Sequence, residues 1–216
     1  MTKNSSLFFI LFFFLFSNAK AQSAFDSIQL NKEYFSLEEA LKKPENVYRL
    51  DLSNQNLKFS DINWSEFINL QYLSLKNDHL KQIPTGLGYL KNLKVLDLSG
   101  NDFKELPSTF NNLTQLQELF LNDDKYFNFK KNIPILSTLP NLKSLHIEND
   151  GLKSLPKDIY RLKSIESLYL NNNQFKLFPM QLKKLNNLKY LDLHDNKFKL
   201  PAENLKNETF GFEIRF

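Results

Sequence analysis

The chain has 216 residues with 28 Lys and Arg, 24 Asp and Glu, a formal net charge of +4 and no cysteine. The lack of cysteine excludes thiol nucleophiles, disulfide frameworks, Cys-ligated zinc and iron–sulfur clusters, and a charge this close to neutral gives no global attraction to nucleic acid. Hydrophobic residues make up 42% and charged residues 24% of the chain, which is typical of a folded globular protein.

Residues 1–21 are expected to be a secretory signal peptide. Lys3 supplies the positive start, the segment 7–16 is uncharged and apolar, and Ala19 and Ala21 place small residues where a signal peptidase recognises them. The apolar segment is about half of the ~20 residues that a membrane-spanning helix needs. Cleavage near Ala21 would leave a mature chain without a transmembrane anchor, secreted or held in the periplasm or cell envelope. The alternatives are a permanent membrane anchor and a buried strand or helix of the fold.

Residues 22–46 are expected to form an N-terminal segment with a helical cap. Ser36 and Glu39 fit a capping box, in which each side chain binds a backbone N–H at the start of a helix. The segment 37–41 supplies an apolar face, and Pro44 ends the helix. A short helix here would cover the first of the repeats described next.

Residues 47–201 contain one apolar pattern about seven times. It reads Leu-x-x-Leu-x-Leu-x-x-Asn-x-Leu, followed by Leu-Pro and two further apolar residues, and it recurs every 23 residues except for one interval of 26. Leu at positions 4 and 6 alternates with more polar residues at positions 3, 5 and 7, which predicts a half-buried strand. The second half suits a short helical or 3₁₀ segment. The repeats begin at Val47, Leu70, Leu93, Leu116, Leu142, Ile165 and Leu188.

This pattern resembles the leucine-rich repeat family, in its 23-residue Leu-Pro class of secreted bacterial type. The resemblance implies an α/β repeat fold: a curved right-handed solenoid with a parallel β-sheet on the concave face and short helical or 3₁₀ segments on the convex face. Stacked repeats would bury one continuous core. The Cys-rich caps common on eukaryotic extracellular members are missing, which favours a bacterial source.

Position 9 of the repeat is normally Asn, whose side chain satisfies backbone groups of the turn. Three repeats carry Asp instead, which accepts hydrogen bonds but donates none when ionised. We therefore expect the ladder of side-chain hydrogen bonds that position 9 makes from repeat to repeat to be interrupted at the aspartates, with local irregularity of the backbone at these turns. The residues at this position are Gln55, Asp78, Asn101, Asp124, Asp150, Asn173 and Asn196.

Residues 202–216 are expected to form a C-terminal cap strand. Phe210, Phe212, Ile214 and Phe216 alternate along the chain, as the side chains on one face of a final edge strand would.

The outward positions of the predicted sheet carry a set of candidate partner-binding residues. Phe120, His146 and Tyr169 would occupy neighbouring rungs of one column, and exposed aromatic clusters rimmed by polar groups are typical of binding hot spots. The alternative is that these rings shield the sheet or bury one another. The candidate set on the concave face is Tyr72, Glu118, Phe120, His146, Tyr169, Tyr190 and Asp192.

The longer fourth repeat supplies a second candidate. Its three extra residues are expected to form a loop beside Phe120, in which Tyr126, Phe127 and Phe129 contact a partner. The alternative is that one or more of these rings replaces a missing core leucine.

The sequence predicts a non-catalytic module with no cofactor and no metal. His146 lies near Glu118 and Ser144 in the repeat register, but no nucleophile elbow, oxyanion-hole motif or phosphate loop accompanies them. The expected partner is a protein rather than nucleic acid. A carbohydrate- or surface-binding solenoid remains an alternative, because many lysines lie in the convex half of the repeats and could meet anionic polysaccharide. An intracellular signalling scaffold is a third reading if residues 1–21 are not a signal peptide.

Overall fold

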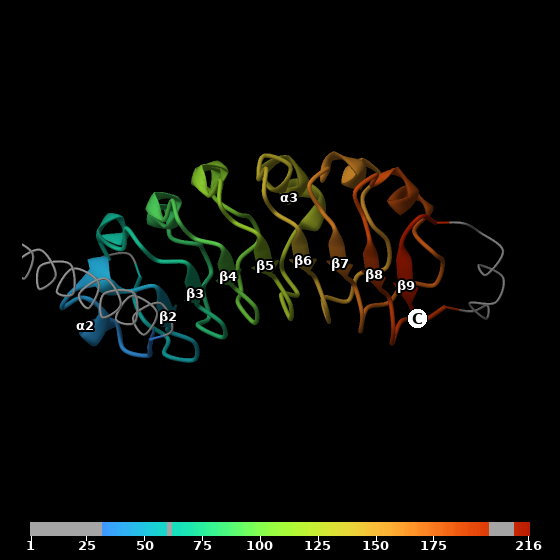
Figure 1. Ribbon diagram of the computed structural model, residues 1–216. Coiled ribbons are helices and arrows are strands. Elements are labelled where there is room, and N and C mark those ends of the chain that lie inside the picture. Colours follow the sequence, from blue (N-terminus) through green and yellow to red (C-terminus); the bar gives the residue numbers. More distant parts are fainter. Residues whose placement is uncertain (1–31, 60–61, 199–209) are drawn as a thin grey trace, which may run out of the picture.

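The computed structural model describes residues 32–59, 62–198 and 210–216. The predicted signal peptide over residues 1–21 lies outside these residues. The described residues form a curved solenoid whose single sheet has nine parallel strands in chain order, β1 to β9. Figure 1 shows these strands side by side along the molecule, with the short helices following one another along one edge. The leucine-rich repeat fold expected from the sequence is therefore confirmed.

Each strand of the repeats covers positions 3 to 5, and equivalent positions pair between neighbours. Leu50, for example, pairs with Leu73, and Leu73 pairs with Leu96. The register keeps the leucines inward and the polar residues outward on every rung. The strands are β1 (Glu33–Tyr34), β2 (Arg49–Asp51), β3 (Tyr72–Ser74), β4 (Val95–Asp97), β5 (Glu118–Phe120), β6 (Ser144–His146), β7 (Ser167–Tyr169), β8 (Tyr190–Asp192) and β9 (Glu213–Arg215).

The convex side of most repeats is a short 3₁₀ helix that begins directly after the proline of the Leu-Pro pair. Proline restricts its own backbone and ends the extended segment before it, so each helix starts at the same place in the repeat. The helical segments are α2 (Leu37–Ala40), η1 (Pro44–Asn46), η2 (Trp64–Glu66), η3 (Thr85–Tyr89), η4 (Ser108–Asn112), α3 (Phe129–Leu136), η5 (Lys157–Arg161) and η6 (Met180–Lys184).

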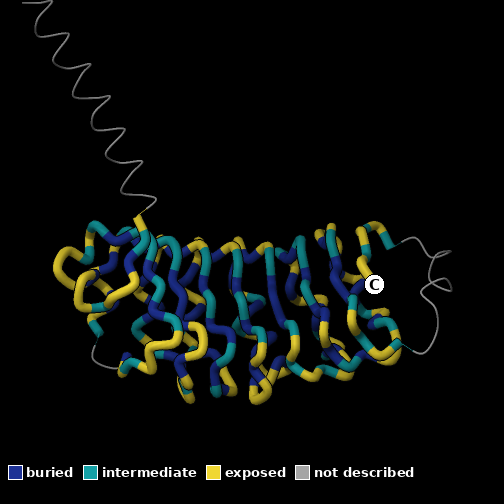
Figure 2. The backbone as a smooth tube through the Cα atoms, turned by 90° about the horizontal axis from the view of Figure 1, so that it is seen from below, coloured by how far each residue is buried: buried dark blue, intermediate teal, exposed yellow. Residues whose placement is uncertain are grey.

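The core is one continuous column of leucines enclosed by the chain. Figure 2 shows buried segments running through every repeat, with exposed residues on the outer turns. Burial of apolar side chains is the main stabilising term, at about 25 cal/mol per Å² of apolar surface. Within the described residues, no helix combines the length and the apolar composition needed to cross a bilayer. The inward leucines of the strands, each fully buried, are Leu50, Leu73, Leu96, Leu119, Leu145, Leu168 and Leu191.

The turn after each strand repeats without backbone irregularity, contrary to our expectation for the Asp-containing turns. The residue at position 8 has a φ between 54° and 70° in every repeat, the Asp-containing ones included. The acceptor half of the ladder also continues: Oδ1 of Asp124 accepts from the N–H of Asn101, and Oδ1 of Asp150 accepts from the N–H of Asp124. One oxygen accepting one N–H is enough to hold this turn, whichever side chain supplies it.

The donor half of this ladder is lost at the aspartates. Nδ2 of Asn101 donates to the carbonyl oxygens of Leu75 and Leu98. In Asp78, Asp124 and Asp150 the second carboxyl oxygen, Oδ2, is buried without a hydrogen-bond partner. A buried polar atom left unpaired costs about 1–3 kcal/mol.

A second ladder of side chains, which we did not predict, joins the repeats on the convex side. The amide groups of Asn69, Asn92, Asn141 and Asn187 each donate to a backbone carbonyl 24 to 27 residues earlier in the chain, at 2.7–2.8 Å. The signal for it in the sequence was the asparagine that directly precedes position 1 at Leu70, Leu93, Leu142 and Leu188.

The insertion in the fourth repeat forms a helix rather than the exposed binding loop that we expected. Residues Phe129–Leu136 form α3, and buried Asn132 binds both the N–H of Leu106 and the carbonyl of Lys104. Phe127 and Phe129 are 9% and 4% exposed, and the Phe127 ring lies 5.7 Å from that of Phe103. The prediction that these two rings contact a partner is therefore wrong, because the longer repeat uses them to fill its core.

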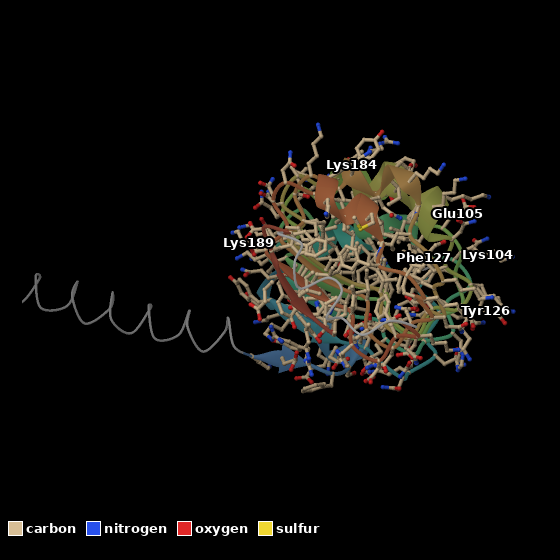
Figure 3. All side chains as sticks on the ribbon, turned by 90° about the vertical axis from the view of Figure 1, so that its right-hand side faces the viewer. Lys104, Glu105, Tyr126, Phe127, Lys184 and Lys189 are labelled. Carbon is tan, nitrogen blue, oxygen red and sulfur yellow. The ribbon has the colours of Figure 1, made fainter. Side chains whose placement is uncertain are left out.

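Tyr126 is the exposed ring of this segment, at 60%. Figure 3, which looks along the solenoid, places Tyr126 on the side opposite Lys189, the residue directly before β8. Phe127 points into the ring formed by the chain in the same view.

Both ends of the sheet carry a strand outside the repeats. At the N-terminal end, β1 pairs with β2, and Ser36 accepts from the N–H of Glu39 to begin α2. Glu39 forms an ion pair with Lys32 at 3.8 Å. At the C-terminal end, β9 pairs with β8, and Phe212 and Ile214 pack against the core.

Gly88 lies in η3 where that helix meets η4, and a side chain does not fit there. A Cβ at Gly88 would lie 2.7 Å from the carbonyl oxygen of Thr109, a backbone atom that cannot move alone. We expect Gly88→Ala to lower the free energy of unfolding by about 1–3 kcal/mol, measured by urea denaturation. Ser108→Ala at the exposed start of η4 is the control, with an expected change within about 0.5 kcal/mol. Equal stability of the two variants would show that the repeats separate freely at this point.

Candidate site on the concave face

Four rings form a continuous stack across β5 to β8, and we call them the aromatic column: Phe120, His146, Tyr169 and Tyr190. Phe120 and His146 stack with their centroids 4.0 Å apart, and His146 and Tyr169 stack at 4.1 Å, with 5° between their planes. Tyr190 touches Tyr169 diagonally, at 5.6 Å and 51°. The spacing follows from the register, because Phe120 pairs with His146 and His146 with Tyr169.

The column is partly buried by its own members. His146 is 8% exposed because a ring covers each of its faces, whereas Phe120, Tyr169 and Tyr190 remain half-exposed. Part of the alternative from the sequence is therefore realised, since the rings do pack against one another. Three of them still offer apolar surface to a partner.

Two carboxylates hold the His146 ring from opposite sides. Glu118 Oε1 lies 3.0 Å from Nε2, and Glu148 Oε2 lies 3.4 Å from Nδ1. The hydrogen bond with His146 is the main cause that lowers the pKa of Glu148 below its usual range. Glu148 was not among the candidates, although its position 7, two residues after His146, was the available signal. Glu118 and Glu148 together orient the imidazole, because each carboxylate contacts one of its two ring nitrogens.

This arrangement does not resemble a catalytic or metal centre. A histidine that activates a serine needs a ring nitrogen facing the hydroxyl, whereas both nitrogens of His146 face carboxylates. Within the described residues, no three His, Asp or Glu side chains are grouped so that they could hold a metal ion.

The middle of the concave face is acidic. Positions 3, 5 and 7 of the repeats containing β4 to β7 carry Asp97, Glu118 and Glu148 but neither Lys nor Arg. Charges of one sign on a concave surface raise the local concentration of partners of the opposite sign. The aromatic column therefore lies within an electronegative strip.

Tyr72 and Asp192 lie on either side of this strip and are held by their own neighbours. The Arg49 guanidinium stacks over the Tyr72 ring at 4.1 Å and binds Glu33 at 3.1 Å. Burial raises the pKa of Tyr72 above its ordinary value. Tyr72 is on β3, two strands from Phe120, so it is not part of the column.

Asp192 is only 3% exposed, which limits what it can offer to a partner. It receives a hydrogen bond from the Tyr190 hydroxyl at 3.3 Å, and its carboxylate lies 2.5 Å from Nδ1 of His194 and 3.5 Å from the Arg215 guanidinium. Asp192 therefore ties β8 to the capping strand β9.

Two family models match the chain, and several solved structures share its fold. A model described as leucine-rich repeat region matches residues 46–139, and one described as leucine rich repeat matches residues 140–198. No curated protein sequence matches the chain. An internalin (InlF) from Listeria monocytogenes is 23% identical over 79% of this chain and 47% of its own, with a TM-score of 0.57.

Two further solved structures are similar. Human 5T4 (Wnt-activated inhibitory factor 1, trophoblast glycoprotein) is 22% identical over 79% of this chain and 69% of its own, with a TM-score of 0.62. A chain of the Drosophila Toll–Spätzle complex is 19% identical over 84% of this chain and 25% of its own, with a TM-score of 0.66. The chain thus spans less than half of the internalin and a quarter of the chain in the Toll–Spätzle complex. These identities show a shared fold only.

Proposed function

Because the chain belongs to the leucine-rich repeat family, we propose that it is an exported, non-catalytic module that binds another protein through its concave face. The observation that carries the proposal is the aromatic column, which leaves apolar surface half-exposed inside an acidic strip. Aromatic anchors in a polar surround are the usual hot spots of protein interfaces. The Drosophila Toll–Spätzle complex, one chain of which shares this fold, is a complex between proteins and supports a protein as the partner.

The partner segment is expected to be positively charged. A cationic side chain placed on the half-exposed Phe120 or Tyr169 ring would gain a cation–π contact. The same side chain would lie next to Glu118 and Glu148, so both terms favour Lys or Arg in the partner. Tyr190 extends the apolar surface by one strand.

Export rests on residues 1–21 and has its own test. We expect the protein recovered from the medium or cell envelope of its producing cell to begin at Gln22, as read by N-terminal sequencing or intact mass. A chain recovered from the cytosol that begins at Met1 would support the intracellular scaffold instead.

The concave face is tested by removing its two flanking rings. We expect the double variant Phe120→Ala, Tyr169→Ala to lose a protein that the wild type captures from envelope and medium extracts. Two hot-spot residues at about 2 kcal/mol each correspond to roughly a thousandfold weaker binding if their effects add. Affinity is measured by calorimetry or surface plasmon resonance once the captured protein is identified.

The matched control replaces two exposed tyrosines of the convex helices, Tyr89→Ala and Tyr160→Ala, which are 64% and 46% exposed. It removes the same kind of surface without touching the column. If the column variant and this control both still capture the partner protein, the partner binds elsewhere than at the aromatic column of the concave face.

A further inference from the structure

A row of lysines runs along the side of the solenoid opposite the sheet. In five repeats the residue at position 12 is an exposed lysine, and in the fourth repeat buried Phe127 takes this position while α3 presents exposed Lys130 nearby. Figure 3 shows Lys104 of this row beside Tyr126, on the side opposite Lys189. We call this set the lysine row: Lys58, Lys81, Lys104, Lys130, Lys153 and Lys176.

Three hollows lie between these lysines and share their walls. The largest, of about 780 Å³, is lined by Lys81, Lys104 and Tyr126 among others. The next, of about 410 Å³, shares Tyr126 and adds Lys130. The third, of about 290 Å³, shares Ser154 and Leu155 with the second and is lined by Lys153 and Lys176. Together they form one interrupted groove along the back of several repeats.

The charge of this groove is positive. Its two acidic residues, Asp102 and Glu105, are both in the largest hollow, where Asp102 lies 3.6 Å from His79 and Glu105 forms an ion pair with Lys131 at 2.8 Å. Among the described residues, none of the five lysines that line the groove has a carboxylate within ion-pair distance. The groove therefore presents uncompensated positive charge, whereas the middle of the concave face is acidic.

We propose that the lysine row is a second binding site, whose ligand is a linear acidic polysaccharide. Its cations follow one another in single file, one per repeat, as the carboxylates of a polyuronate chain do along the glycan. Between them, the 60%-exposed Tyr126 ring and the 76%-exposed Leu177 offer apolar surface for the faces of sugar rings. A flat membrane would meet only the outermost lysines, and duplex DNA, with a charge every ~1.7 Å, calls for a denser basic surface.

The test uses the purified protein and immobilised polygalacturonate, with dextran as the uncharged polymer. The row variant carries Lys130→Glu, Lys153→Glu and Lys176→Glu. The matched control carries Lys42→Glu, Lys91→Glu and Lys163→Glu, which are exposed lysines outside the groove and change the net charge equally. Circular dichroism confirms that both variants fold, and binding is measured at low and at physiological salt.

We expect the wild type to bind polygalacturonate but not dextran, the row variant to bind about tenfold more weakly or worse, and the control to bind like the wild type. Added salt should weaken the wild-type interaction. If both variants lost polygalacturonate binding equally, binding would depend on net charge alone, and the lysine row would not be the binding site. Binding of anionic vesicles or duplex DNA more tightly than polygalacturonate would overturn the choice of ligand. Absence of wild-type binding would overturn the proposal and leave the concave-face interaction untouched.

Discussion

Replacing Phe127 with alanine is expected to lower the free energy of unfolding by about 3 kcal/mol or more, the usual cost of removing a buried aromatic ring. Phe127 is 9% exposed and contacts the rings of Phe103 and Phe129, so its removal leaves a cavity in the fourth repeat. Its core neighbours belong to the third and fourth repeats, which limits how far the site can collapse. For a chain of this size the loss corresponds to a fall in melting temperature of roughly 6–12 °C.

The adjacent residue, Tyr126, supplies the control for this experiment. Tyr126→Ala removes a side chain that is 60% exposed and is expected to change stability by less than about 0.5 kcal/mol. Thermal and urea unfolding followed by circular dichroism measure both variants, with a second probe to establish a single transition. If Phe127→Ala left the free energy of unfolding almost unchanged and Tyr126→Ala lowered it strongly, Tyr126 rather than Phe127 would be the buried ring of this segment.

Asp124→Asn is expected to stabilise the protein by about 1–3 kcal/mol near neutral pH. Asp124 is 1% exposed, its Oδ1 accepts from the N–H of Asn101, and its Oδ2 has no partner. Burial raises the pKa of its carboxyl to about 9, and the nearby Asp150 carboxylate adds to this. Asparagine would keep the acceptor and supply the amide donor that Asn101 and Asn173 use for two carbonyls.

The same variant changes how stability depends on pH. The folded chain keeps a proton on Asp124 up to about pH 9, whereas the unfolded chain releases it near pH 3.8. The folded state therefore holds more protons between these values, and the free energy of unfolding falls as pH rises through them. Asp150, whose pKa burial raises to about 7, adds a similar fall below that pH.

Urea unfolding at several pH values between 4 and 9 tests this account. We expect the gain from Asp124→Asn to grow as pH rises and to be smallest near pH 4, where the unfolded wild-type chain also begins to hold a proton on Asp124. Asp158→Asn, at a half-exposed site in η5, serves as the control and should run parallel to the wild type. A stabilisation independent of pH would mean that the carboxyl of Asp124 is not held protonated by the fold.

The 23-residue period was sufficient to predict the strands and their neighbours. Since each repeat advances the chain by one rung, equal positions in successive repeats had to pair, and Phe120, His146 and Tyr169 had to be adjacent. The same logic extends to the position-12 lysines, which lie at equivalent places along the back. The alternation of leucine with polar residues then determined which side chains face inward.

Features that depend on side-chain packing could not be read from the period. The sequence shows that the fourth repeat has three extra residues, but only the packed structure turns them into α3 and directs Phe127 and Phe129 into the core. The reason is that a longer convex segment leaves space that apolar rings fill more favourably than water does.

The candidate site divides in the same way. The sequence determined by itself that a ring column crosses the sheet, because strand register is a property of the repeat. Only the three-dimensional structure shows that rings cover both faces of His146 and that Glu118 and Glu148 contact its two nitrogens. It also shows the ion pair of Asp192 on β8 with Arg215 on β9. Such contacts depend on rotamers selected jointly by neighbouring strands, whereas the repeat pattern depends only on each residue's place along the chain.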